Sequence, residues 1–145
     1  MHGQFAVGAV CCLINIAIHA AIMAWVVTAA RRASRATARL GAARHHIAVM
    51  SATVLVLLIA HALEVGVWAI VYRLVNLVPV GDGFYFAFVN YTTLGYGDIL
   101  PAPEWRMLGP ITAMNGVLMF GWSTAVIFEV LRTSAGALRD LPTHS

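Results

Sequence analysis

The chain has 145 residues, of which 61% are hydrophobic and only 10% are charged, and its formal net charge is +3. Soluble domains carry about 25% charged residues, so this composition excludes an ordinary soluble domain and indicates a membrane protein. A pI near 9.3 is also typical of nucleic-acid binding, but in so apolar a chain we interpret the arginines as determinants of helix orientation, and we expect no nucleic-acid partner.

Three apolar stretches follow one another along the chain, at residues 5–30, 47–72 and 107–131. Each reaches the ~20 residues that a membrane-spanning helix needs. The first stretch is too long for a secretion signal, and its arginines follow the apolar run instead of preceding it. We therefore predict three spanning helices, the first of which is retained.

A basic segment at residues 31–46 joins the first two apolar stretches. It contains five arginines and no acidic residue, which predicts a cytoplasmic loop because positive residues stay on that side of a membrane. The N-terminus then lies outside and the C-terminus in the cytoplasm. These features predict a multi-pass protein of the cell (inner) membrane, with the loop's arginines attracting anionic membrane lipids.

A short aromatic segment at residues 84–92 lies between the second and third apolar stretches. It is too short to span a bilayer, and we predict that Asp82 caps it as a helix, with Gly81 and Gly83 providing the turn before it. Irregular backbone that follows such a helix at membrane depth is tolerated only where protein shields it or where it lines a wet cavity.

Residues 92–98 read Thr-Thr-Leu-Gly-Tyr-Gly-Asp. A row of backbone carbonyls that face one axis can replace the hydration shell of a cation. Pointing successive carbonyls the same way requires backbone angles of alternating hand, and the positive-φ half of that alternation costs little only for glycine. Gly95 and Gly97 occupy alternate positions, as this backbone requires.

From about residue 47 to residue 132 the chain resembles the pore domain of potassium channels, which carries a T-V-G-Y-G loop. The string Thr93-Leu94-Gly95-Tyr96-Gly97-Asp98 matches, except that Leu94 stands where valine or isoleucine is usual. The resemblance implies an all-α membrane protein with three transmembrane helices, a re-entrant pore helix and a selectivity-filter loop. It also implies a homotetramer, transported K⁺ and no organic cofactor.

The same resemblance implies roles for individual residues. Carbonyls of Thr93, Leu94, Gly95 and Tyr96, with the Thr93 hydroxyl, would form successive K⁺ sites, and Gly97 would close the outer mouth. Residues expected to support the filter are Tyr85, Val89, Thr92 and Asp98. Among these we predict a hydrogen bond between Tyr85 and Asp98, within the chain or across subunits. Some members of this family place a glutamate behind the filter, where this chain has Val89. Support of the filter by a glutamate side chain is therefore not expected here.

Two glycines of the third apolar stretch are candidates for gating. Gly116 and Gly121 resemble the hinge region of inner helices in the same family. Glycine costs about 1 kcal/mol inside a helix, so it usually has a local reason. Close packing and bending at a gate both remain open, and Glu129 with Arg132 forms either a pair near that gate or a plain surface pair.

His61 and Glu64 lie on one face of the second apolar stretch, at membrane depth. The first interpretation is a structural pair, bonded to each other or to Asn15 and His19 of the first stretch, because buried polar groups are generally satisfied. The second is a pH-sensitive element, since histidine titrates near neutrality.

The resulting hypothesis is a potassium-selective channel subunit that performs no enzymatic reaction and has no identified soluble partner. Its segments would be a helix with a basic loop (1–46), a pore domain (47–132) and a short cytoplasmic tail (133–145). One alternative is a weakly selective cation channel. Another is a membrane haem- or metal-binding protein that uses His19 and His61 as ligands.

Overall fold

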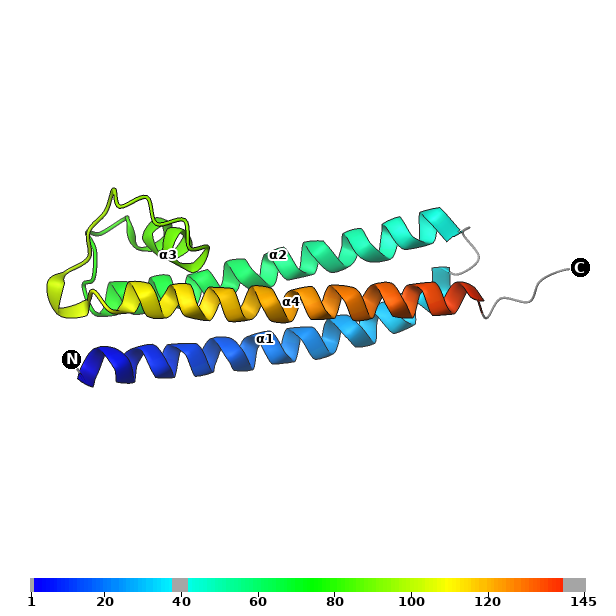
Figure 1. Ribbon diagram of the computed structural model, residues 1–145, viewed down its shortest axis with the longest axis horizontal. Coiled ribbons are helices and arrows are strands. Elements are labelled where there is room, and N and C mark those ends of the chain that lie inside the picture. Colours follow the sequence, from blue (N-terminus) through cyan, green and yellow to red (C-terminus); the bar gives the residue numbers. More distant parts are fainter. Residues whose placement is uncertain (1, 38–41, 140–145) are drawn as a thin grey trace, which may run out of the picture. The chain divides into compact units, whose positions relative to one another are not determined.

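A computed structural model describes residues 2–37 and 42–139 of the chain. The described part is helical, and its elements are α1 (His2–Thr37), α2 (Ala42–Leu74), α3 (Gly83–Tyr91), the 3-10 helix η2 (Pro103–Trp105) and α4 (Leu108–Arg139) (Figure 1). Three helices, α1, α2 and α4, are long and apolar enough to cross a membrane. The prediction of three helices of spanning length is confirmed.

The long helices extend beyond the apolar stretches that predicted them. The loop predicted over residues 31–46 is wrong for most of its length, because α1 continues to Thr37 and α2 begins at Ala42. Arginine and alanine are strong helix formers, so hydrogen bonding of the backbone continues where hydrophobicity stops. Arg39 and the end of the predicted tail, residues 140–145, lie outside the described residues.

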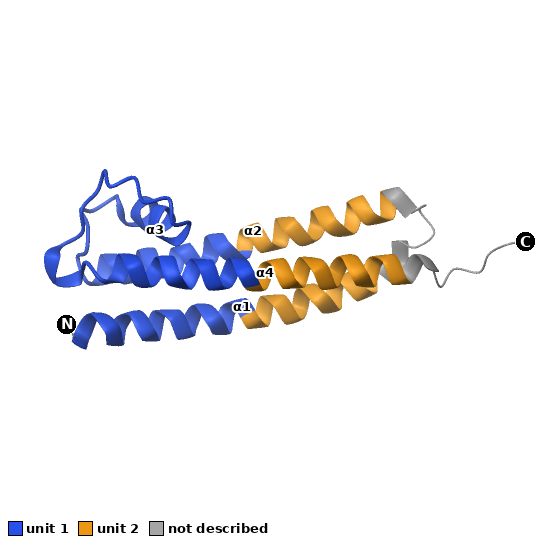
Figure 2. Ribbon diagram, viewed as in Figure 1, with its two compact units in different colours: residues 1–19, 60–121 blue, residues 20–59, 122–145 orange. Residues whose placement is uncertain are grey.

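The helices are organised in two compact units, and each unit draws on all three long helices (Figure 2). Unit 1 comprises residues 1–19 and 60–121, and unit 2 comprises residues 20–59 and 122–145. The boundary within α4 falls directly after Gly121.

In unit 1, α1 and α4 run in the same direction. Gln4 near the start of α1 accepts a hydrogen bond from the Met107 amide just before α4 (2.9 Å), and Asn15 further along α1 donates to Asn115 further along α4 (2.9 Å). Gly8 permits this approach, because a Cβ there would lie 2.8 Å from the Ile111 side chain. The helices α1 and α4 therefore pack in parallel.

The direction of α2 in unit 1 is opposite to that of α4. Trp68 donates its indole N–H to Asn115 (3.0 Å), whereas Tyr72, one turn later in α2, bonds Thr112, which lies earlier in α4 (2.5 Å). The buried core around these contacts consists of Cys11, Val65, Trp68, Tyr72, Leu77, Phe86, Ala87, Tyr91, Leu108 and Met119. The three long helices thus alternate in direction, as three successive membrane crossings require.

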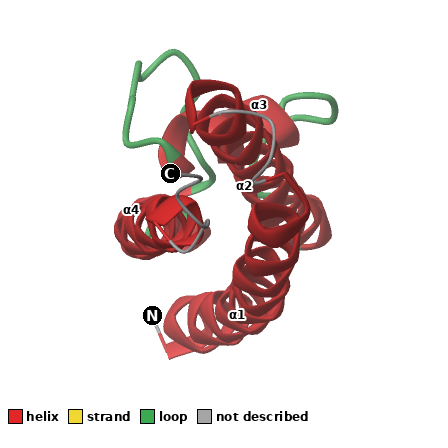
Figure 3. Ribbon diagram, turned by 90° about the vertical axis from the view of Figure 1, so that its right-hand side faces the viewer, coloured by secondary structure: helices red, strands yellow, loops and turns green. Residues whose placement is uncertain are grey.

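The short helix α3 begins and ends one residue before its predicted limits, at Gly83 and Tyr91. Asp82 occupies the position before it, but the predicted cap is wrong, because the Asp82 side chain makes no capping hydrogen bond. Gly81 has φ +107 and provides the turn. Seen along the long helices, the loops on either side of α3 lie away from the start of α1 (Figure 3).

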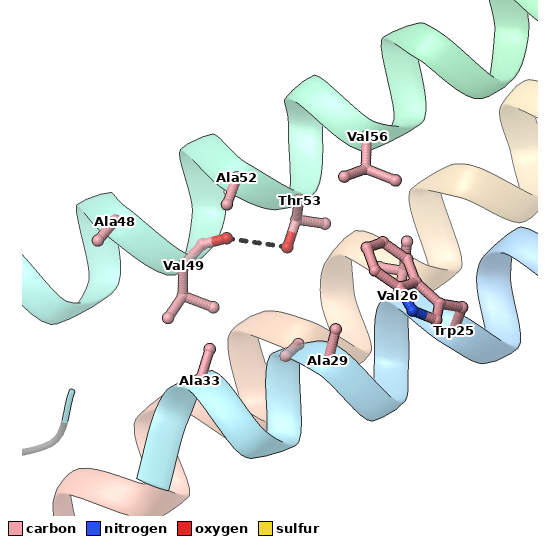
Figure 4. Close-up of a pocket in the computed structure, with 10 residues that line it drawn as sticks. Trp25, Val26, Ala29, Ala33, Ala48, Val49, Ala52, Thr53 and Val56 are labelled. Atoms are coloured by element: carbon pink, nitrogen blue, oxygen red, sulfur yellow. Dashed lines mark hydrogen bonds between the residues drawn. The ribbon is translucent and has the colours of Figure 1, made fainter. Parts of the chain in front are cut away.

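In unit 2, the second half of α1 packs against the first half of α2. The core here contains Met23, Val26, Ala30, Val49, Leu57, Val126 and Val130. Small residues from both helices, including Ala29, Ala48 and Ala52, leave an apolar cavity of about 190 Å³ between them (Figure 4). Thr53 also lines it, and its hydroxyl donates to the Val49 carbonyl of its own helix (2.9 Å).

Candidate functional site

The segment after α3 has the alternating backbone that the sequence predicted. Positive φ angles occur at Thr93 (61°), Gly95 (58°) and Gly97 (74°), and Leu94 and Tyr96 between them are not in that region. Left-handed angles suit glycine but are unusual for a β-branched residue. Thr93 is therefore the strained member of the segment, and strained backbone of this kind clusters at functional sites.

The last turn of α3 holds the inner end of this segment through the main chain. The Val89 carbonyl accepts hydrogen bonds from the amides of Leu94 (2.9 Å) and Gly95 (3.4 Å). The Thr92 hydroxyl and the Thr92 amide both donate to the Phe88 carbonyl, at 2.9 and 3.0 Å. Val89 thus contacts the candidate filter segment through its backbone, whereas the expectation from the sequence concerned only its side chain.

Tyr85 and Asp98 hold the outer end of the segment. The Tyr85 hydroxyl donates to a carboxylate oxygen of Asp98 within the same chain, at 2.6 Å, so the predicted hydrogen bond is confirmed. That bond to Asp98 raises the pKa of the Tyr85 phenol above its ordinary value, because it stabilises the protonated donor. Tyr85 therefore remains a donor at physiological pH.

Residues 93–98 are exposed in the single chain. The exposed fraction is 53% for Leu94 and 67% for Tyr96. The described part of the single chain leaves both side chains largely uncovered. The segment is therefore held by its own chain at both ends but left open along its length.

The two candidate gating glycines have different surroundings. A Cβ at Gly116 would collide with the carbonyl of Tyr91, the last residue of α3. At Gly121 a Cβ would meet no described atom within 4 Å. Gly116 is accordingly explained by close packing of α3 on α4, whereas packing within the described chain gives no reason for Gly121.

His61 and Glu64 belong to a larger polar cluster. The Glu64 carboxylate is fully buried and contacts His19 Nδ1 of α1 at 2.7 Å and His61 Nδ1 at 3.3 Å. It also accepts a hydrogen bond from the hydroxyl of Tyr91, and that hydroxyl lies 3.0 Å from His61 Nδ1. The expected pairing with His19 is confirmed, and the cluster could hold a metal ion, because its ligand atoms lie within 4.8 Å of one another.

Sequence reasoning missed two members of this network, Tyr91 and Asn115. In the sequence, Tyr91 is one aromatic residue among several in a short apolar segment. In the structure, its hydroxyl bonds Glu64 of α2. The Asn115 side chain accepts hydrogen bonds from both Asn15 and Trp68. A lone asparagine in an apolar stretch was the available signal, because polar groups at membrane depth commonly bond across helices.

The last candidate, Glu129, lies in unit 2 and forms two ion pairs. It contacts Arg132 at 3.0 Å within α4 and Arg31 of α1 at 3.6 Å. Both arginine side chains are more than half exposed, and exposed ion pairs contribute only about 0–1 kcal/mol. The pair predicted from the sequence is present, and its geometry is that of a surface pair.

A family model described as an ion channel matches residues 49–133. The match includes α3, the candidate filter segment and most of α4, and it leaves out the whole of α1. No curated protein and no solved structure matches the sequence significantly.

Proposed function

Because the chain belongs to the ion channel family, we propose that it is the subunit of a potassium-selective channel. K⁺ would move passively, down its electrochemical gradient, past the main-chain oxygens of residues 93–97. No covalent chemistry is involved. In this proposal, α3 is the re-entrant pore helix, α2 is the outer helix and α4 is the inner helix.

The observation that carries the proposal is the alternating hand of the backbone at Thr93, Gly95 and Gly97. Alternation turns successive carbonyls toward one side of the strand, and carbonyl oxygens are ligands that can replace the water around K⁺. The amides of Leu94 and Gly95 are bonded to Val89. These amides therefore point back toward α3, which leaves the carbonyl side free for ions.

One strand gives one row of carbonyls, and a cation needs oxygen atoms all around it. We therefore propose a homotetramer, because identical subunits around one axis are the usual form of closed assembly. The exposed residues 93–98 support this arrangement. In the cell membrane, the basic residues 31–46 would place the N-terminus outside and the C-terminus in the cytoplasm.

The decisive experiment measures ion flux from proteoliposomes that contain the purified chain, under K⁺ and Na⁺ gradients. The expected result is a K⁺ flux well above that of Na⁺. Comparable fluxes would instead establish a weakly selective cation channel. No flux of either ion from correctly assembled protein would overturn the channel proposal.

A matched pair of glycine substitutions tests the filter itself. Gly95→Ala places a Cβ on a residue with φ +58, which costs about 1–2 kcal/mol in each subunit. We expect it to reduce K⁺ flux at least tenfold. Gly66→Ala in α2 serves as control, because a Cβ there meets no described atom within 4 Å and flux should persist.

A further inference from the structure

The buried polar cluster in unit 1 joins three elements around one carboxylate. His19 comes from α1, His61 and Glu64 from α2, and Tyr91 from the end of α3. His19 and Glu64 are fully buried, and the His61 side chain is 13% exposed. The nitrogen and oxygen atoms that face one another lie within 4.8 Å for the three residues His19, His61 and Glu64.

Hydrogen bonds hold this cluster together, and the nitrogen and oxygen atoms that share each proton could also bind a cation through their lone pairs. An ionised carboxylate only accepts hydrogen bonds, so an imidazole nitrogen that bonds Glu64 must carry hydrogen. Each Nδ1 becomes a lone-pair donor when the imidazole hydrogen sits on Nε2 instead. A cation placed among His19, His61 and Glu64 would then replace the bridging protons and be bound by the same atoms.

Two imidazoles and one carboxylate form a ligand set that Zn²⁺ and similar ions favour, because they combine nitrogen and oxygen donors. We propose that His19, His61 and Glu64 form a binding site for a divalent transition-metal ion of the zinc class. The site is distinct from the proposed K⁺ pathway, which uses main-chain oxygens of residues 93–97.

The spacing of the three side chains is compatible with this site. Ligand atoms lie about 2.0–2.2 Å from Zn²⁺, and hence about 3.4 Å from one another in a tetrahedral site. The Nδ1 atoms of His19 and His61 contact different oxygens of Glu64, at 2.7 and 3.3 Å, and the three ligand atoms lie within 4.8 Å of one another. The Tyr91 hydroxyl, bonded to Glu64 and 3.0 Å from His61 Nδ1, lies where it can orient the carboxylate or complete the coordination.

Charge also favours a cation at this position. Glu64 is a fully buried carboxylate that contacts two imidazoles and the Tyr91 hydroxyl, and buried charges in proteins are paired or coordinate metals. A bound ion would connect α1, which lies outside the ion channel match, to the part of α2 inside it. The metal would thereby fix the N-terminal helix against the channel domain beside the last residue of α3.

The test uses the full chain, purified in detergent with a chelator and then titrated with Co²⁺, which reports its coordination by visible absorption. We expect one Co²⁺ per chain, an absorption typical of a tetrahedral site, and displacement by Zn²⁺. Glu64→Gln should abolish this signal. Tyr91→Phe, which removes a contact to the ligand carboxylate, should weaken the affinity by about 10- to 100-fold.

Two further variants keep the test decisive. His61→Gln alters the partly exposed ligand and carries the test if Glu64→Gln does not fold; it should also lose the signal. His46→Gln removes a histidine that bonds Ser134 in unit 2 and should bind as the wild type does. The proposal is overturned if folded wild-type protein binds no Co²⁺, or if binding survives loss of the His61 ligand. This measurement involves no ion flux, so its result is independent of the channel proposal.

Discussion

Thr93 is a β-branched residue with a strained backbone conformation. Its φ of 61° lies in the left-handed region, which costs an L-residue about 1–2 kcal/mol. Gly95 and Gly97 adopt the same region without that cost. We propose that the Thr93 hydroxyl oxygen is a ligand for a dehydrated cation at the inner end of the candidate filter.

Tyr85→Phe tests the hydrogen bond that supports the outer end of the same segment. The substitution removes the donor to Asp98 and leaves the ring in place. We expect the ratio of K⁺ to Na⁺ flux in proteoliposomes to fall by roughly two- to tenfold, the range that corresponds to loss of one hydrogen bond. An unchanged ratio would show that Asp98 needs no partner there.

The pH dependence of this bond has a defined direction. Asp98 raises the pKa of the Tyr85 phenol, so the protonated form is the one stabilised in the folded chain. The stability that the Tyr85–Asp98 hydrogen bond contributes is complete below the ordinary tyrosine pKa of about 10. It is lost as the pH rises through the raised pKa of Tyr85 in the folded chain. The flux ratio of the wild type should therefore not change between pH 6 and pH 9 on account of this residue.

At the scale of elements, the position of α3 depends on contacts at its end. Tyr91 reaches Glu64 of α2 with its hydroxyl, and its carbonyl lies against Gly116 of α4. Val89, two residues earlier, holds the first residues of the candidate filter. The candidate filter begins at Thr93, two residues after the end of α3. Any shift of α3 would therefore also move the candidate filter.

Gly116→Ala is expected to destabilise the packing of α3 on α4. The new Cβ would collide with the Tyr91 carbonyl, which is main chain and cannot move without moving α3. Overpacking of this kind costs about 1–3 kcal/mol. The measurement is the free energy of unfolding in mixed micelles, followed by circular dichroism.

Gly121→Ala is the matched control within the same helix. A Cβ there meets no described atom within 4 Å, and alanine favours a helix over glycine by up to about 1 kcal/mol. Its unfolding free energy should be equal to or above that of the wild type. Equal stability of the Gly116 and Gly121 variants would contradict the packing role of Gly116.

At the scale of the whole molecule, the exposed surface is strongly apolar. Leu13, Leu58, Ile70 and Phe128 each have more than 60% of their surface exposed. In a chain with three helices of spanning length, such side chains face lipid or another subunit. The exposed candidate filter has no such explanation in lipid, because its free carbonyls need polar partners.

The chain is therefore expected to assemble as a homotetramer in detergent and in membranes. Native mass spectrometry of the solubilised protein should give four copies per particle. As an independent check, a cysteine introduced at the exposed Tyr96 should form cross-links between subunits. Monomers or dimers as the largest species would contradict the proposed pore, since fewer strands cannot surround an ion.

The sequence by itself determined the number of helices of spanning length, the short helix between the last two and the positive φ of Gly95 and Gly97. These features depend on local properties: the length of apolar runs, the freedom of glycine and short-range hydrogen bonding. It also indicated that His61 and Glu64 would find partners on the first helix, because buried polar groups are rarely left alone.

Only the tertiary structure decided which partners these were. Tyr91 joins Glu64 across 27 positions of sequence, and Asn115 meets Asn15 across 100; no local pattern encodes contacts at such separations. The same holds for Gly116, whose neighbour is a carbonyl of another helix. The ends of the helices also needed the structure, because apolar runs mark the part of a helix inside the membrane, whereas backbone hydrogen bonds continue into the arginine-rich segment.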